Sequence, residues 1–279
     1  MNSAAFRRPR LSSICYSPHP MPITFDEPPL NEVSLGRTFL PRPDFLVPHY
    51  GAFWERIRAD FPKVEHAAPI LTQGEGGEFI DQGQFWLPRV WFVSGDATRL
   101  LQLQQNRFHY NWRHTPALTH YIRFPAIQEV AVILWAEFSA FIEQQTGQPL
   151  VPLVNELTYT NLIVGEETES AFDIADRSLR DSVWSSHERF LSQPSQLTHS
   201  CSFHIPGGVG ELAVAVATGR RPDGRNVLKL DLTVHGKALK GIELGEWSQA
   251  AHDFLVAGFK DLTTPAMHVK WRLKETENE

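Results

Sequence analysis

The sequence predicts an α+β fold built from a pseudo-duplicated unit, an antiparallel meander followed by a long helix, with the helices packed on one face of the sheet. Short runs of alternating apolar and polar residues, separated by polar turns, are typical of antiparallel strands. Each set of runs precedes a long segment whose apolar residues recur at spacings of three and four, as in an amphipathic helix. Because this order occurs twice, we expect two similar halves that share one sheet or lie side by side.

The composition is that of a folded protein. Of 279 residues, 42% are hydrophobic and 21% are charged, which supplies enough apolar surface to offset the entropy lost on folding. The net charge of -6 creates no general field that would attract nucleic acid. The two cysteines, Cys15 and Cys201, have neither a pairing pattern nor metal-ligand spacing, and no apolar run reaches the roughly 18 residues of a membrane span. We therefore expect a cytoplasmic protein that makes no contact with a membrane.

The amino-terminal segment differs from the rest in charge. Three arginines precede the first acidic residue, Asp26, and three prolines between residues 18 and 22 disfavour regular structure. We expect residues 1–25 to form a disordered basic tail, or to extend the chain upstream of a start at Met21. The first α+β half then spans residues 26–165 and the second spans residues 166–279.

In the first half, proline and glycine mark the ends of the predicted helices. Pro48 suits the first turn of a helix that ends before Pro62, and Gly147 ends the long helix. Four glycines and few apolar residues at 72–84 indicate a loop. The predicted elements are a strand at 31–40, a helix at 48–61, strands at 89–93, 99–104 and 107–113, a helix at 125–146 and a strand through 157–163.

The second half repeats this order after an acidic stretch that predicts a weak helix at 166–181. Pro222, Asp223 and Gly224 are typical of a turn between two of its strands. The predicted strands are 200–205, 211–218 and 226–235, and the predicted helix is 246–262. We expect the large tryptophans to lie mostly on core faces, namely Trp91, Trp112, Trp135, Trp247 and Trp271.

Alternation in the strand at 107–113 separates its side chains onto two faces. Two arginines and a histidine on one face suit an anion, because guanidinium groups offer forked donors to phosphate or carboxylate. A half-exposed antiparallel sheet also carries such residues simply to meet water, and we expect this solvated face. Nucleic-acid binding is disfavoured, since the aromatic residues alternate away from the basic face. The candidate ligand-binding residues are Arg107, His109, Asn111 and Arg113, and the apolar face holds Phe108, Tyr110 and Trp112.

Histidines near carboxylates raise the alternative of acid–base chemistry. Asp231 and His235 share one face of the strand at 226–235, and with His252 they would form a hydrolase or transferase site if the three met in a cleft. His252 and Asp253 point about 100° apart on a helix, and no motif marks a serine or cysteine nucleophile. A hydrogen-bonded histidine at the boundary of the core is therefore the expected role of His252.

A metal or cofactor is not expected. His109, His114 and His120 run from a strand into a loop and have no companion cluster of ligands. The glycines at 74, 76 and 77, and those at 207, 208 and 210, do not follow the strand-turn-helix arrangement of phosphate loops.

Several runs form a fingerprint near the middle and the end of the chain. They are Pro88-Arg89-Val90-Trp91-Phe92-Val93, Thr98-Arg99-Leu100-Leu101-Gln102-Leu103-Gln104, Arg107-Phe108-His109-Tyr110-Asn111-Trp112-Arg113, and Leu262-Thr263-Thr264-Pro265 with Trp271. In these residues the chain resembles a sporadically distributed family of uncharacterised bacterial proteins of similar length, over residues 31–271. The resemblance implies no catalytic residues. The patchy distribution of the family implies a mobile-element, defence or toxin–antitoxin context.

From these observations we predict a non-enzymatic module that binds a protein partner, or forms a homo-oligomer, through the exposed sheet face or a sheet edge. An elaborate apolar fold without an identifiable catalytic constellation is the reason for this prediction. Two alternatives stay open: a hydrolase or transferase that uses the His/Asp residues, and an anion-binding or nucleic-acid-binding protein that uses the basic strand face.

Overall fold

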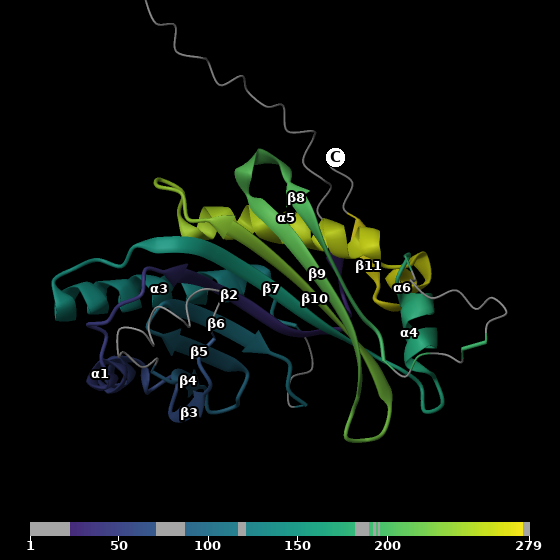
Figure 1. The fold of residues 1–279 in the computed structure, drawn as a ribbon, viewed down its shortest axis with the longest axis horizontal. Helices are drawn as coiled ribbons and strands as arrows, with labels where there is room; N and C mark the ends of the chain where they lie inside the picture. The colour runs from purple at the N-terminus through teal and green to yellow at the C-terminus, as the bar shows by residue number, and fades with distance from the viewer. Residues whose placement is uncertain are drawn as a thin grey trace, which may run out of the picture.

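The computed structural model describes residues 23–70, 87–116, 121–181, 190, 191, 194 and 196–275. Within them lie a nine-stranded sheet, a two-stranded sheet and the helices that cover them (Figure 1). The elements of the first part of the chain are β1 (Ile23–Phe25), β2 (Leu30–Phe39), α1 (Val47–Ile57), β3 (Lys63–Ala67), β4 (Arg89–Val93), β5 (Arg99–Gln104), β6 (Arg107–Arg113) and α3 (Phe124–Thr146). They are followed by β7 (Pro152–Val164), α4 (Ala171–Ser178), β8 (Thr198–Ile205), β9 (Gly210–Arg220), β10 (Asn226–Lys237), α5 (Leu244–Leu262), α6 (Pro265–Lys270) and β11 (Leu273–Glu275).

The large sheet has the order β3-β4-β5-β6-β2-β7-β10-β9-β8, and neighbouring strands are antiparallel. Its two central strands, β2 and β7, pair with each other, and each also pairs with the last strand of the meander that follows it, β6 or β10. A meander followed by a long helix therefore occurs twice within one continuous sheet, and the predicted α+β class is confirmed. The predicted limit between the halves, at residue 165, follows directly after β7, the strand that pairs with β2 at the centre of the sheet.

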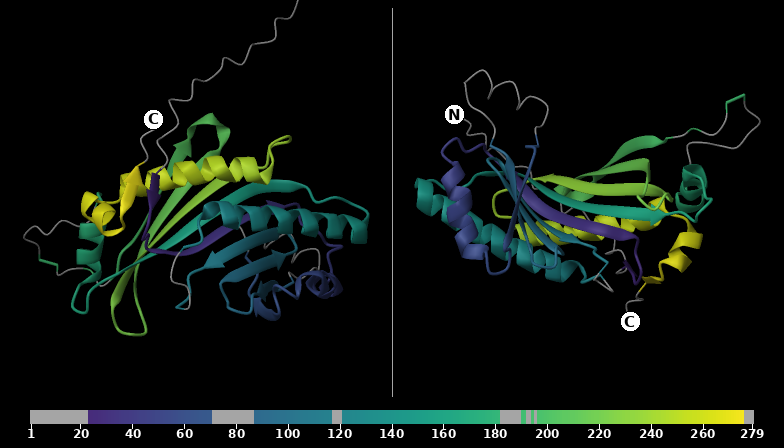
Figure 2. Two further views of the ribbon diagram at one scale, coloured as in Figure 1. Left: turned by 180° about the vertical axis from the view of Figure 1, so that it is seen from behind. Right: turned by 90° about the horizontal axis from the view of Figure 1, so that it is seen from below.

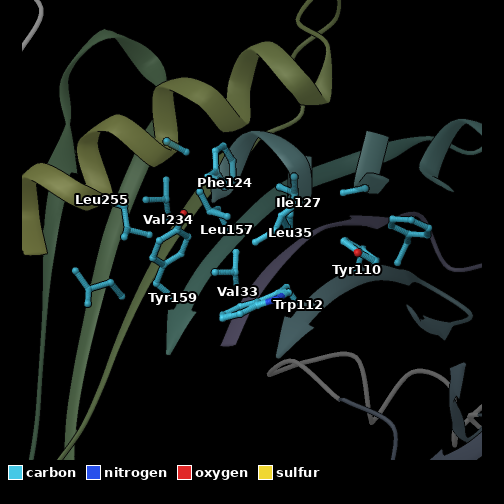
Figure 3. Packing of buried hydrophobic residues seen from close by; sticks show 14 of the residues in the cluster. Val33, Leu35, Tyr110, Trp112, Phe124, Ile127, Leu157, Tyr159, Val234 and Leu255 are labelled. Atoms are coloured by element: carbon cyan, nitrogen blue, oxygen red, sulfur yellow. The ribbon is translucent and has the colours of Figure 1, made fainter. Parts of the chain in front are cut away.

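The two long helices, α3 and α5, lie across the same face of the sheet, as the view from behind shows (Figure 2). We call this the apolar face. Its strand positions include Val33, Leu35, Leu157, Tyr159 and Val234, which gather beneath the helices (Figure 3). The opposite side chains of the same strands form what we call the polar face. The period-two alternation of the sequence thus becomes the two sides of the sheet, with the core between the apolar face and the helices.

Helix α3 has the length and composition of a membrane-spanning helix, with 23 residues and a mean hydropathy of 1.4, and no second helix of the described residues does. Its packing is that of a core helix. The ring of Phe138 lies 5.3 to 6.1 Å, between centroids, from the rings of four phenylalanines of β2, α1, β6 and the connection before α1. Burying one such side chain contributes about 2–3 kcal/mol. The buried residues of α3 therefore pack in the core, whereas Ile133, on its outer side, is 57% exposed.

Several helix ends follow the rules applied to the sequence. Gly147 adopts a φ of 71° and donates its backbone N–H to the carbonyl of Glu143, which ends α3 in the left-handed conformation that glycine tolerates. Ser170 and Asp173 form a capping box at the start of α4, the helix predicted as weak. Gly224, with a φ of 86°, forms the predicted turn before β10.

Four elements were missing from the prediction. One of them is β3, an exposed edge strand whose five residues have no apolar period. The helix α1 was predicted, but it ends at Ile57, four residues before the predicted end. β1 and β11 are three-residue strands that pair with each other and bring the two ends of the described chain together, next to the short helix α6. The predicted tail (1–25, apart from its last three residues) and the predicted loop at 72–84 lie outside the described residues.

Candidate functional site

A row of charged and polar residues crosses the centre of the polar face. In the strand register, His109 of β6 is opposite Gly36 of β2, Gly36 is opposite Glu156 of β7, and Glu156 is opposite His235 of β10. Atom Oε2 of Glu156 lies 3.0 Å from Nε2 of His109 and 3.8 Å from Nη1 of Arg107, and Oε1 lies 3.3 Å from Nδ1 of His235. One carboxylate therefore connects basic side chains from both halves of the sheet. We call these four side chains, from Arg107, His109, Glu156 and His235, the polar cluster.

Gly36 makes the cluster possible. A Cβ atom at this position would lie 2.1 Å from the carbonyl oxygen of Phe108 and 2.6 Å from Nδ1 of His109. The missing side chain therefore leaves the space that the imidazole of His109 occupies as it crosses β2 toward Glu156. This is a glycine required by close approach rather than by its backbone conformation.

The pKa of Glu156 reflects two opposing effects. Burial on the sheet would raise it, but hydrogen bonds from His109 and His235 and the charge of Arg107 outweigh burial and hold the pKa below its ordinary value of 4.5. Glu156 is therefore ionised at neutral pH. A negative charge at the centre of the polar face opposes the binding of an anion there.

The other two predicted ligand-binding residues are also paired with a carboxylate. Asn111 donates to Oε1 of Glu32 at 2.5 Å and accepts from Gln102 at 2.7 Å. Nε of Arg113 lies 3.7 Å from the same Glu32 oxygen. The four residues Arg107, His109, Asn111 and Arg113 do share one face, as predicted, but their donors are directed at Glu156 and Glu32.

The prediction of a solvated face is wrong for part of this strand. Arg107 and Asn111 are only 5% and 2% exposed. The physical reason is that these side chains reach across the sheet to carboxylates on β7 and β2, so they meet protein atoms instead of water. Because each basic group already has a nearby carboxylate or amide partner, the geometry disfavours the anion-binding alternative.

Trp91 also departs from the prediction, because it lies on the polar face and not on the core face. It is a half-buried residue of β4, and the guanidinium carbons of Arg89 and Arg113 lie 5.2 and 5.1 Å from the centroid of its ring. The attraction between these two guanidinium groups and the face of the indole stabilises Trp91 on this side of the sheet.

The three residues proposed for acid–base catalysis do not come together. Asp231 and His235 lie on the polar face, where Asp231 accepts from Lys229 at 2.5 Å and His235 contacts Glu156. His252 lies on α5, beyond the apolar face. The sheet itself separates the two groups, so a hydrolase or transferase site that uses all three is not formed. Among the described residues no cluster of three or more histidine, cysteine, aspartate or glutamate side chains has metal-binding geometry, and His120 lies outside them.

His252 takes the expected role of a hydrogen-bonded histidine at the boundary of the core. Its Nδ1 lies 2.8 Å from the hydroxyl of Tyr159, and its ring stacks on Phe124 with centroids 4.2 Å apart and an interplanar angle of 10°. Burial lowers the pKa of His252 from 6.5 to about 4. The imidazole is therefore neutral at physiological pH.

The two edges of the large sheet differ in length and charge. At one edge, β3 has five residues, including the charged Lys63 and Glu65. At the other edge, β8 has eight residues, Thr-His-Ser-Cys-Ser-Phe-His-Ile, none of them lysine, arginine, aspartate, glutamate or proline. Proteins commonly use charge, proline and short length to keep an edge from pairing with other chains. Of the edges in the described part of the chain, β8 lacks these protections.

Sequence reasoning did not identify the two carboxylates, Glu32 and Glu156, that pair with the predicted site residues. Glu32 and Glu156 sit at alternating polar positions of their strands, and this alternation was the available signal. It indicates which face each carboxylate occupies, but the strand order is needed to place Glu156 two strands from His109. Tyr159 lies on the apolar face of β7, and only the position of α5 reveals its contact with His252.

Comparison of this chain with protein-family models, with curated proteins and with solved structures finds no match in any of the three.

Proposed function

We propose that this chain is a non-enzymatic binding protein that associates with a second copy of itself through the outer edge of β8. The observation that carries the proposal is the contrast between a short edge at β3, which contains lysine and glutamate, and a longer edge at β8, which contains no lysine, arginine, aspartate or glutamate. A strand edge presents unpaired backbone N–H and C=O groups, which form a ladder with an incoming strand.

A second copy fits this edge by symmetry. When two β8 strands pair antiparallel about a twofold axis, each contributes the same residues, so the contact is closed and the two sheets become one. Because the strand has no lysine, arginine, aspartate or glutamate, no pair of such like charges opposes antiparallel pairing of two copies. Phe203, which is 43% exposed on the helix side of β8, would lie over the junction and bury apolar surface.

The expected dimer is weak. Eight residues a side make an interface below the roughly 1,000 Å² typical of stable complexes, so association in the micromolar range is expected. Such a contact suits a reversible assembly. The two cysteines of the sequence, without a pairing pattern, support a cytoplasmic location for it.

Sedimentation equilibrium of the full chain over low to high micromolar concentration tests the proposal. The wild type is expected to move from 31.7 kDa toward twice that mass. Ser202→Lys, at an exposed position of β8, places a charge beside its symmetry mate and is expected to weaken association about tenfold, since like charges across a strand pair repel.

Gln145→Lys adds the same charge at an exposed position of α3 and serves as the control. It is expected to associate as the wild type does. A wild type that stays at 31.7 kDa throughout, or an association that both variants share unchanged, contradicts pairing through β8.

A further inference from the structure

A cavity of about 320 Å³ lies between the start of α3, the middle of α5, β1 and the apolar face at β7. Most of its lining is apolar, and Figure 3 shows Phe124, Tyr159 and Leu255 in the layer between α5 and the sheet. This volume is at the lower end of the range for small-molecule sites, which typically begin near 300 Å³. It is about twice the roughly 150 Å³ of a cavity that accommodates benzene.

One wall of the cavity carries a chain of hydrogen bonds. The hydroxyl of Tyr121 lies 3.3 Å from the hydroxyl of Tyr159, which lies 2.8 Å from Nδ1 of His252. Burial raises the pKa of Tyr121 to about 12, raises that of Tyr159 well above 10, and lowers that of His252. All three side chains are therefore uncharged at neutral pH.

The one charged residue among the described residues that line the cavity already has partners. Arg123 lines the cavity, but its Nη1 donates to the carbonyl oxygen of Phe25 at 2.9 Å and its Nη2 lies 3.3 Å from Oδ1 of Asp26. Asn161, also in the wall, donates to the carbonyl oxygen of Leu230. The cavity therefore offers little to stabilise a buried charge, which would lose its hydration on entering.

The imidazole of His252 has one N–H group that can donate to a ligand. If Tyr159 donates to Nδ1, the neutral ring carries its proton on Nε2. In the described part of the chain no hydrogen-bond partner contacts Nε2, although His252 lines the cavity.

We propose that this cavity binds an uncharged, mainly apolar small molecule with one hydrogen-bond acceptor, which receives the Nε2 proton of His252. The apolar walls take up the body of the ligand, and the hydrogen-bonded chain of tyrosines fixes the imidazole that orients it. This site is separate from the β8 edge, so it stands or falls independently of self-association.

Titration calorimetry of the full chain at pH 7 with three probes tests the proposal. 2-Acetonaphthone has the apolar body and a carbonyl acceptor, naphthalene lacks the acceptor, and 2-naphthoate carries a charge. We expect saturable binding of one 2-acetonaphthone per chain. Naphthalene is expected to bind about fivefold more weakly, as for the loss of one hydrogen bond, and 2-naphthoate at least about tenfold more weakly.

Two variants and one control variant test whether the probes bind in this cavity. Val256→Trp fills it and is expected to abolish binding, whereas Val269→Trp, at an 82% exposed position, is the matched control and is expected to bind normally. His252→Phe keeps the ring shape but has no donor, so it should remove the fivefold preference for 2-acetonaphthone over naphthalene. Absence of saturable binding, equal binding by the two tryptophan variants, or an unchanged preference in His252→Phe would overturn the proposal.

Discussion

Acid sensitivity provides a direct measure of how His252 is buried. Its pKa is about 4 in the folded chain and 6.5 as the ordinary value, so the unfolded chain binds the proton first as the pH falls. The contribution of His252 to stability is therefore constant above about pH 6.5 and decreases between pH 6.5 and 4. Evaluated from these two pKa values, lowering the pH from 7 to 5 reduces the free energy of unfolding by about 2 kcal/mol through this residue alone.

The variant His252→Phe isolates the effect. Phenylalanine preserves stacking on Phe124 but does not titrate, so its free energy of unfolding should fall about 2 kcal/mol less than that of the wild type between pH 7 and 5. Urea denaturation at both pH values measures the difference, and His114→Phe at an exposed position is the control. Loss of hydrogen bonding to Tyr159 lowers stability equally at both pH values, so it does not affect the comparison. Equal pH dependence of the wild type and His252→Phe would refute the assignment of a buried, neutral imidazole.

Other substitutions test the sheet and the core. Gly36→Ala should lower the free energy of unfolding by at least about 1–3 kcal/mol in urea, because its Cβ would overlap the carbonyl of Phe108; an unchanged value would mean that β2 is not held this close to β6. Glu156→Gln should cost about 3 kcal/mol at pH 7, and, since its folded pKa lies below 4.5, the variant should lose less stability than the wild type as the pH falls below 4.5; superimposable acid-unfolding curves would argue against the polar cluster. Phe138→Ala should cost about 3–5 kcal/mol in thermal or urea unfolding, whereas Ser170→Ala, which removes only a helix cap, should cost about 1 kcal/mol; the reverse ranking would contradict the packing of α3.

The elements with strong periodicity could be predicted from sequence. The strands β4, β5 and β6 have the predicted limits, because each is a short run rich in β-forming apolar residues and polar turns separate them. β3 could not be found in this way, since an edge strand exposed on both sides has no apolar period to detect. β1 and β11 are stabilised by each other, over a separation that spans nearly the whole described chain, so local sequence does not indicate them.

The faces of the strands were predictable, but the partners across them were not. Alternation alone assigns His109 and Glu156 to polar positions, whereas their 3.0 Å contact depends on the order β6-β2-β7 and on the small size of Gly36. Arg37 is a charged residue on the apolar face, a position that alternation alone does not explain. It is 6% exposed, because its Nε donates to Asn155 at 2.7 Å and its guanidinium stacks on Trp135. A charged residue within an apolar alternation is thus accommodated by partners that only the folded chain supplies.

The central position of β2 has a consequence for synthesis of the chain. β2 is made early, and one of its sides pairs with β6, but the strand that covers its other side, β7, begins only at Pro152. A nascent chain released or stalled before that residue would carry an open strand in the middle of its future sheet. Two such fragments would each present this open strand in place of the missing second half, so interrupted translation exposes the chain to misassembly.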